Sequence, residues 1–311
     1  MDETARIAML ARTLGASAAG LKVGIGDDAA VLETPVGSPL IVWTIDEQVE
    51  GVHFRRDMLS WRDVGWRSVM AAASDVAAMG ARPWGALCAL VLPDDVDDAA
   101  LESIACGQRD ATAELGAPVV GGNLSRGPAL SLATTFLGTT ARAVPRSAGR
   151  PGDGVWLAGR VGLAAAGLRA LSAGLGGDRR LQTAIESWRR PRALVEQGLV
   201  MARVASAAVD VSDGLARDAG HIAGASGVCI VLHEQALTTD AGLVEAAAAL
   251  GASALELALY GGEDYALVVT SPEPIEGFRL VGEVTEGQGI ALRGPTGDHR
   301  IEPRGFDHFG S

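Results

Sequence analysis

Acidic residues recur along this chain where strands are expected to end and helices to begin. The segment GIGDDAAVL, residues 24–32, places Asp27 and Asp28 behind a glycine turn and ahead of an apolar run. Asp46 follows the apolar run of PLIVWTID, residues 39–46, at the predicted end of a strand. Gly and Asp are common in solvated turns, so a turn explains either place taken alone. Their recurrence points to chemistry, because α/β proteins often bind ligands at strand ends.

Asp75 lies within a segment of helical periodicity, WRDVGWRSVMAAASDVAAMG, residues 61–80. On a helical wheel its neighbours form a stripe suited to burial: Val64, Ser68, Ala71, Ala72 and Met79. An unpaired carboxylate buried on such a stripe is costly unless a cation or hydrogen-bond donors compensate. The position therefore favours a cation site, with a structural arginine partner as the alternative.

Two further acidic motifs lie in the second half of the chain. The segment AAVDVSDGLARD places Asp210 after a predicted strand, and Ser212 and Asp213 ahead of a helix. Ser and Asp are common N-caps, which explains one of the last two residues but not Asp210. The segment YGGEDYALVV adds Glu263 and Asp264 after a glycine pair, where a turn into a strand is the alternative.

Carboxylates in such numbers suit Mg²⁺, which binds a few of them and keeps its other positions for water or phosphate oxygens. The sequence has no G-x-x-x-x-G-K-[ST] motif, no protein-kinase signature, and a single lysine, Lys22. If the chain binds ATP, the negative charge of the phosphates must be met by metal ions, by arginines such as Arg126 and Arg146, and by backbone amides. The glycine pair of VVGGNLSRGP offers such amides, although it is a weak motif alone. His53 lies between Val52 and Phe54, where packing and ligand binding are both open.

The elements that must position these residues alternate in type. Strand-like runs at 39–46, 85–93, 117–122 and 130–140 are interleaved with helix-like runs at 61–80 and 97–116. Pro, Gly and Arg cluster in RAVPRSAGRPGDG, residues 142–154, which is typical of a domain junction. A second unit follows, with strands at 155–159 and 228–233 and an Ala-rich helix at 241–250. We expect an α/β (α+β) protein with an N-terminal domain over 1–141 and a C-terminal domain over 142–311.

Composition narrows the classes of partner. The chain has 311 residues, 48% of them hydrophobic, and a formal net charge of −12, which argues against nucleic acid or an anionic membrane as a partner. Its three cysteines fit neither a zinc site nor a disulfide framework. Residues 1–16 lack the basic start and continuous apolar core of a signal peptide, and no apolar run has the length of a membrane span. We expect a cytoplasmic protein.

The motifs as a set resemble the bacterial thiamine-monophosphate kinases, within the superfamily of aminoimidazole ribonucleotide synthetase. They occur in the family's order and spacing from about residue 20 to 309: GIGDDAAV, TIDEQVEGVHF, SDVAAMGARP, GGNLSRGP, RSAGRPGD, DVSDGLARDAGHI, GGEDY and GFDHF. The resemblance implies a two-domain fold in which the N-terminal domain pairs across a homodimer and the C-terminal domain closes the site. It also implies ATP-dependent phosphorylation of thiamine monophosphate to thiamine diphosphate by direct in-line transfer.

The resemblance assigns roles by position. It implies a cluster of several Mg²⁺ ions held by Asp27, Thr44, Ile45 (through its backbone), Asp46, Asp75, Asn123, Asp210 and Asp213, of which Asp210 and Asp213 are the catalytic pair. ATP, the co-substrate, would contact Gly122, Asn123, Arg146 and Ser212. Thiamine monophosphate would contact His53, Glu263 and Phe306. Asp28 is expected to be a structural neighbour of Asp27.

This chain departs from the family pattern at two positions. Asn123 stands where the family usually has Asp, which removes one charge from the metal cluster, and Phe306 stands where Tyr is usual, which keeps the aromatic face. Two alternatives therefore stay open at this point. One is a sibling enzyme of the superfamily, such as the selenophosphate or hydrogenase-maturation branches, whose characteristic cysteines we do not find. The other is a non-catalytic nucleotide-binding protein.

Overall fold

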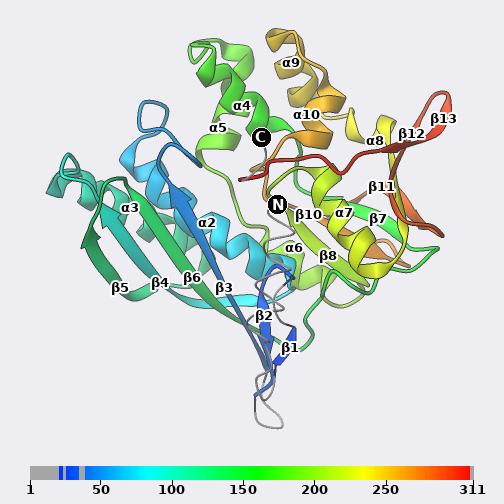
Figure 1. Ribbon diagram of the computed structural model, residues 1–311, viewed down its shortest axis with the longest axis horizontal. Coiled ribbons are helices and arrows are strands. Elements are labelled where there is room, and N and C mark those ends of the chain that lie inside the picture. The colour runs from blue at the N-terminus through cyan, green and yellow to red at the C-terminus, as the bar shows by residue number, and fades with distance from the viewer. Residues whose placement is uncertain (1–20, 24–25, 35–38, 309–311) are drawn as a thin grey trace.

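The computed structural model describes residues 21–23, 26–34 and 39–308. The segment 1–16, in which we expect no signal peptide, lies outside these ranges. So do Gly24 and Ile25 of the first acidic motif and Phe309 of the last motif. Figure 1 shows two sheets side by side, each with its own helices, and the elements keep its labels throughout.

The first sheet has six strands in the order β1-β2-β3-β6-β4-β5. Its strands are β1 (Leu21–Val23), β2 (Ala30–Leu32), β3 (Leu40–Val49), β4 (Arg82–Leu92), β5 (Val119–Arg126) and β6 (Ser131–Thr140). All neighbours pair antiparallel except β4 and β5, which are parallel and are joined through a helix. Val42 and Thr44 of β3 are buried while Trp43 and Ile45 are exposed, so one face of this sheet is covered and the other is open.

Helices α2 (Trp61–Ala78) and α3 (Asp98–Leu115) accompany this sheet. A capping box between Ser60 and Asp63 starts α2, and Gly116 ends α3 in the left-handed conformation. The two helices touch at glycines, because a Cβ on Gly65 would lie 2.0 Å from the carbonyl oxygen of Ile104. Such close contact makes α2 and α3 one layer behind the strands (Figure 1).

The second sheet has seven strands in the order β13-β12-β9-β11-β7-β10-β8. Its strands are β7 (Gly154–Ala158), β8 (Ala207–Val211), β9 (Cys229–His233), β10 (Ala266–Ser271), β11 (Arg279–Thr285), β12 (Gly289–Gly294) and β13 (Gly297–Ile301). Only the β9–β12 pair is parallel. The helical elements are α4 (Leu163–Ser172), η1 (Arg179–Leu181), α5 (Gln182–Arg189), α6 (Val195–Met201), α7 (Leu215–Ser226), α8 (Glu234–Leu237), α9 (Ala241–Leu250) and α10 (Ala254–Tyr260).

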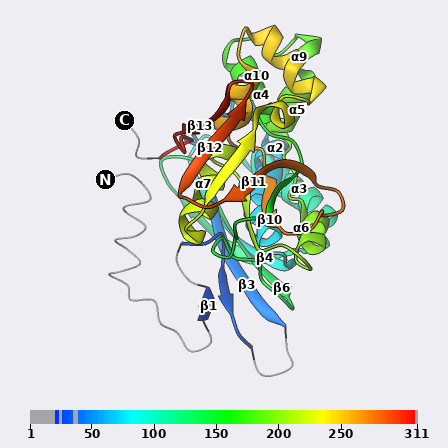
Figure 2. The ribbon, with the colours of Figure 1, turned by 90° about the vertical axis from the view of Figure 1, so that its right-hand side faces the viewer.

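The C-terminal end of α2 packs against the second sheet. Ala77 and Ala78 belong to the same buried cluster as Met201, Ala208 and Leu267. Figure 2 shows the resulting shape, with β1 and the tips of the first sheet at one end and α4, α5, α9 and α10 at the other. Helix α2 is therefore shared between the two halves of the molecule.

These elements confirm the α/β class. The predicted runs agree with α2, α3, α9 and the central strands within a few residues, whereas β11, β12 and β13 have no counterpart among the predicted elements. The first sheet ends at Thr140 and the second begins at Gly154, so the predicted boundary at 141/142 falls between them. The independence of the two domains stays a prediction.

No single helix in the described part of the chain is long and apolar enough to cross a membrane. Helices α9 and α10, which are bent by 110° relative to each other, would together have the length and composition of a span, by these two criteria only.

Candidate active site

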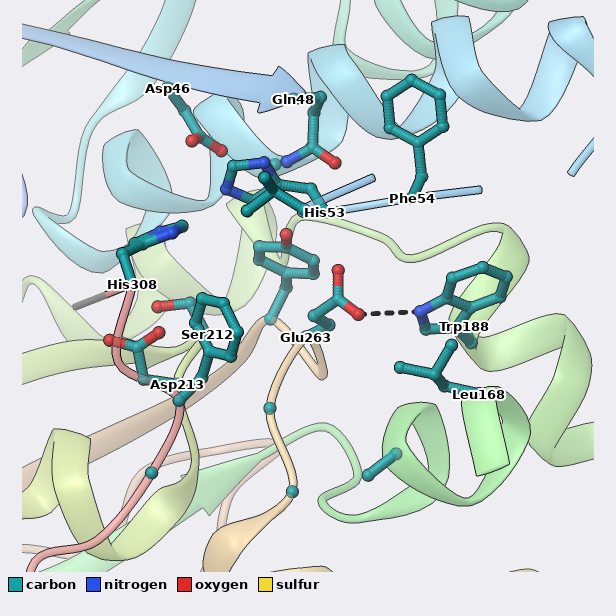
Figure 3. Close-up of a pocket in the computed structure, with 18 of the residues that line it drawn as sticks. Asp46, Gln48, His53, Phe54, Leu168, Trp188, Ser212, Asp213, Glu263 and His308 are labelled. Carbon is teal, nitrogen blue, oxygen red and sulfur yellow. Dashed lines mark hydrogen bonds between the residues drawn. The ribbon is translucent and has the colours of Figure 1, made fainter. Parts of the chain in front are cut away.

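One pocket of about 620 Å³ lies where α2 and β3 of the first half face β8, α5 and the 260–265 loop of the second. Figure 3 shows side chains from both halves pointing into it. Nine of the residues predicted to form the site line this pocket: Ile45, Asp46, His53, Asp75, Asp210, Ser212, Asp213, Glu263 and Phe306. Positions that span most of the chain thus meet in one cavity.

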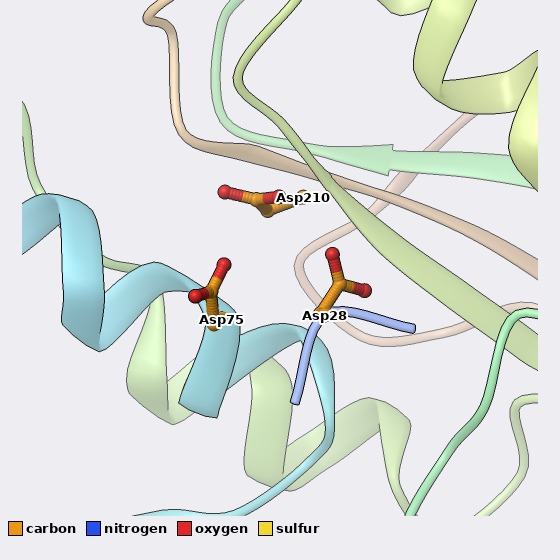
Figure 4. A group of neighbouring side chains, drawn as sticks. All are labelled: Asp28, Asp75 and Asp210. Carbon is orange, nitrogen blue, oxygen red and sulfur yellow. The ribbon is translucent and has the colours of Figure 1, made fainter. Parts of the chain in front are cut away.

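At one end of the pocket three carboxylates converge (Figure 4). Asp28 lies just before β2, Asp75 on α2, and Asp210 on β8, and one oxygen from each lies within 4.8 Å of the others. We call Asp28, Asp75 and Asp210 the acidic group. Two of its members come from the first half and one from the second, so the group exists only because the two halves pack together.

Neighbouring hydroxyls fix the orientation of the acidic group. Thr44 Oγ1 donates to Asp75 Oδ2 at 2.6 Å, and Ser74 Oγ donates to Asp210 Oδ2 at 2.7 Å. Burial, together with the charge of Asp28, raises the pKa of Asp210 to about 8. Burial and the charges of Asp210 and Asp28 raise the pKa of Asp75 well above its usual value. A divalent cation bound between these three carboxylates would remove the repulsion between them.

Asp27 and Asp28 have different surroundings. Asp27 accepts backbone N–H bonds from Asp28 at 2.9 Å and from Arg146 at 3.0 Å, and burial and the charge of Asp28 raise its pKa to about 6. The guanidinium of Arg146 donates to Asp28. Burial on its own would lower the pKa of the Arg146 guanidinium, but the negative charge of Asp28 raises that pKa above its usual value. Asp28 thus joins the acidic group directly, which the sequence interpretation had missed, while the role of Asp27 as a metal ligand stays a prediction.

Asp46 and Asp213 lie beyond the acidic group on the pocket wall. Burial raises the pKa of Asp46 to about 6, although the N–H of Glu47 donates to it at 2.7 Å. The loop that carries Ser212 and Asp213 is held by Asp218, whose carboxylate accepts the N–H groups of Asp213 and Gly214, each at 3.1 Å. Asp218 is thus a positioning residue that the sequence interpretation missed.

The other end of the pocket is built around Glu263. Its carboxylate accepts from the buried guanidinium of Arg67 on α2 and, at 2.7 Å, from the indole nitrogen of Trp188 on α5. The backbone of Glu263 has φ of 65°, a left-handed conformation that is uncommon for glutamate and frequent at functional sites. Arg67 also donates to the carbonyl oxygen of Trp188, so one arginine links both partners.

Aromatic and imidazole rings close this end of the pocket. His53 Nδ1 accepts the N–H of Val49 at 3.0 Å, and burial, then the charge of His308, lower the pKa of His53. The His53 and His308 ring centroids are 4.9 Å apart, and Phe306 meets His308 edge-on at 4.7 Å. The N–H of Phe306 donates to the backbone carbonyl oxygen of Asp213 at 3.0 Å, which holds the 302–308 segment across the site.

Gly122 and Asn123 are not brought to this pocket. Both are exposed on β5, at the edge of the first sheet. The register runs from Glu47 through Ala133 and Ala89 to Asn123, three strand spacings or roughly 14 Å. A Cβ on Gly122 would lie 1.8 Å from the carbonyl oxygen of Cys88, so strand pairing alone requires this glycine.

Asp264 and Arg126 were also singled out in the sequence, and the structure gives them different contacts. Asp264 accepts the N–H groups of Gly162 at 2.6 Å and Ala164 at 3.0 Å, so it anchors the start of α4 and is structural. Arg126 is exposed at the end of β5, 3.2 Å from Asp94. The sequence interpretation missed Gln48, Arg67, Trp188 and His308; the His-Phe dipeptide that ends both GVHF and GFDHF was the one visible signal for the last.

The first half of the molecule, which supplies two of the three carboxylates of the acidic group, contains a domain of the AIR synthase related class. The family model described as "AIR synthase related protein, N-terminal domain" matches residues 26–140. The curated thiamine-monophosphate kinase of Aquifex aeolicus is 34% identical over 290 residues, 92% of each chain. That of Methanopyrus kandleri is 36% identical over 280 residues, 88% of this chain and 87% of the relative. The chain belongs to the thiamine-monophosphate kinase family.

Solved structures agree with this assignment. The structure described as "AaThiL complexed with AMPPCP and TMP" superposes with a TM-score of 0.91 at 34% identity, covering 99% of this chain and 97% of the other. The hydrogenase maturation protein HypE superposes with a TM-score of 0.70 at 19% identity, over 87% of this chain and 90% of the other, which shows a shared fold alone.

Proposed function

We propose that the protein transfers the γ-phosphoryl group of ATP to thiamine monophosphate and releases ADP and thiamine diphosphate. The observation that carries this proposal is a single pocket with the acidic group at one end and the Glu263–Trp188–Arg67 contacts at the other. Family membership and the likeness to a relative complexed with AMPPCP and TMP support both substrates.

The donor set fits Mg²⁺, since it consists of carboxylate and hydroxyl oxygens. Asp28, Asp75 and Asp210 would hold one ion, and Asp27, Thr44, the Ile45 carbonyl, Asp46 and Asp213 are proposed ligands of others around the same end of the pocket. Bound there, Mg²⁺ would neutralise the phosphates and the charge that develops during transfer.

The remaining chemistry needs no strong base. An oxygen of the acceptor phosphate attacks the γ-phosphorus in line, the bond from that phosphorus to the ADP oxygen breaks, and the electron pair leaves with ADP. The attacking oxygen is already ionised at neutral pH, so no proton has to be removed. Asp218 holds the Ser212–Asp213 loop in place for this step, and the guanidinium of Arg146 donates a hydrogen bond to Asp28 next to Asp75.

Glu263, His53 and Phe306 are proposed to bind the acceptor. Glu263 is fixed by two donors and its charge faces the cavity where a cationic thiazolium ring would lie (Figure 3). Phe306 offers an aromatic face without the phenolic hydroxyl. His53 donates through Nε2 when neutral, because its Nδ1 accepts from the backbone.

We also propose that the protein works as a homodimer through the open face of the first sheet. Large apolar side chains are exposed on its strands: Trp43, Ile45, Trp84, Leu87, Val120 and Leu124. An apolar patch of this kind marks an interaction surface. The proposed contacts of Gly122 and Asn123 with ATP and metal depend on this pairing, since within one chain both lie on the sheet edge.

The test is to incubate the purified protein with ATP, Mg²⁺ and thiamine monophosphate and to measure thiamine diphosphate and ADP by chromatography. Equal amounts of both products, dependent on all three additions, are expected. Binding of ATP without formation of thiamine diphosphate would instead favour a non-catalytic nucleotide-binding protein. Release of ADP at the same rate with and without thiamine monophosphate would favour another phosphotransferase of the superfamily.

A further inference from the structure

Gln48 is a buried polar residue on the pocket wall whose side-chain oxygen has no hydrogen-bond partner among the described residues. It lies on β3, two residues after Asp46, and only 3% of its surface is exposed. Its Oε1 is buried and receives no donor from any described residue. A buried amide without a partner is unfavourable and therefore uncommon, so the position calls for a function.

The surroundings of Gln48 explain why no donor reaches it. Its cross-strand neighbour is the fully buried Leu132, and Phe54 lies beside it on the same pocket wall. The neighbouring polar groups direct their hydrogen bonds elsewhere: Trp188 donates to Glu263, and the terminal nitrogens of Arg67 donate to Glu263 and to the Trp188 carbonyl, while Arg67 Nε is buried without a partner. The side-chain oxygen of Gln48 is thus left unpaired among largely apolar side chains.

The amide is directed into the cavity and not into the core. Figure 3 shows Gln48 extending from β3 next to His53, toward the space that the carboxylate of Glu263 also faces. Rotation about the last side-chain torsion, which has a broad energy profile, can present either the oxygen or the NH₂ end to a ligand. A bound molecule is therefore the available partner for both ends.

We propose that Gln48 is a specificity-determining residue that binds the aminopyrimidine ring of the acceptor. This inference rests on the proposed function. A primary amide presents a donor and an acceptor side by side, which matches a ring nitrogen next to an exocyclic amino group. Gln and Asn pair with the same kind of edge on adenine. Gln48 binds this neutral ring edge, while Glu263 faces the positive charge.

The test compares wild type with Gln48→Leu, which keeps the side-chain volume and removes both polar ends. Steady-state kinetics and calorimetric titration are run with thiamine monophosphate and with its analogue in which hydrogen replaces the ring amino group. We expect Gln48→Leu to raise the KM and Kd for thiamine monophosphate at least about 10-fold. The KM for ATP should stay within about twofold, and the wild-type preference for the amino compound over the compound that lacks the amino group should be lost.

Thermal unfolding without ligands separates binding from structure. Removing an unpaired buried amide should leave the Tm of Gln48→Leu unchanged or raised. The matched control is Gln108→Leu: Gln108 is 8% exposed, lies outside the pocket, and donates to Cys88 Sγ at 3.0 Å. That variant should lower Tm and leave the KM for thiamine monophosphate unchanged.

Each outcome is decisive. Wild-type turnover, together with an unchanged KM or an unchanged preference for the amino compound over the one without the amino group in Gln48→Leu, would overturn the role of Gln48 and leave the proposed function standing. A lowered Tm with unchanged discrimination would make Gln48 a structural residue. Failure of the wild type to bind or phosphorylate thiamine monophosphate would overturn the proposed function and, with it, this inference.

Discussion

At the scale of single residues, Asp75 combines a cost in stability with a proposed role in metal binding. Its carboxylate lies on an otherwise buried helix face next to two other carboxylates, and its pKa is raised by burial and by their charges. Asp75→Asn should lower kcat on the order of 100-fold, comparable to removing one charge-stabilising group from an active site. The same change should raise Tm in the absence of Mg²⁺, because it removes charge repulsion.

Kinetics and thermal unfolding, each with and without Mg²⁺, check this prediction. Asp110→Asn is the control, since Asp110 pairs with Arg62 on the surface of α3 and should change neither quantity appreciably. Near-normal turnover of Asp75→Asn at low millimolar Mg²⁺ would show that Asp75 is structural.

Asn123 tests the charge of the proposed metal sites. A neutral amide oxygen can bind Mg²⁺ but more weakly than a carboxylate, so wild type should need more Mg²⁺ for half-maximal kcat than Asn123→Asp. Asn123→Ala, which lacks a ligand atom, should need the most. The measurement is the Mg²⁺ dependence of kcat at fixed ATP. Coincident curves for wild type and Asn123→Asp would place position 123 away from the metal.

At the scale of elements, Asp264 couples the start of α4 to pH. Burial raises its pKa to about 7 even though two backbone N–H groups donate to it. Because the folded-state pKa lies above the unfolded value, the folded state binds this proton more tightly. The stabilisation is complete below about pH 4 and is lost as pH rises through about 7. At about 1.4 kcal/mol per pKa unit, the upper bound is about 4 kcal/mol.

Asp264→Asn should therefore unfold with a flatter pH dependence than wild type. At pH 5 the variant should be the less stable, because one of the two N–H groups loses its acceptor; by pH 8 the difference should shrink or reverse. Urea unfolding at several pH values in chelator measures it. Asp178→Asn is the control, since Asp178 caps η1 and hydrogen bonds from Arg180 lower its pKa, outside this window. Parallel curves for wild type and Asp264→Asn would contradict the assignment.

Local sequence patterns predicted the elements better than the contacts between them. The periodicity of 61–80 suffices for α2, and the run before Asp210 suffices for β8. The strand β13 exposes nearly all its residues, so no alternation marks it. Arg67 and Glu263 are 196 positions apart and Trp188 and Glu263 are 75 apart, and such pairs depend on how two sheets pack. The isolation of Gln48 likewise becomes visible only in three dimensions.

At the scale of the whole molecule, the open face of the first sheet predicts the assembly. Trp84 on β4 is 67% exposed, and five other large apolar residues are exposed on the same sheet. Trp84→Arg should convert a dimer into a monomer, because it places a charge within the apolar contact. Light scattering after gel filtration gives the mass. Val244→Arg, which alters an exposed apolar residue on α9, should keep the dimer, and a monomeric wild type would refute the proposed pairing.

Helix α2 bears on both ends of the pocket, since Arg67 holds Glu263 and Asp75 belongs to the acidic group. These two residues are eight positions apart, or about 12 Å along the axis at 1.5 Å per residue. Because a packed helix does not stretch, this interval is the same in every copy of the protein. With the roles proposed for Glu263 and the acidic group, an acceptor would have to carry its ring and its phosphate a matching length apart, and a fragment that reaches only one end of the pocket would lose the contacts at the other.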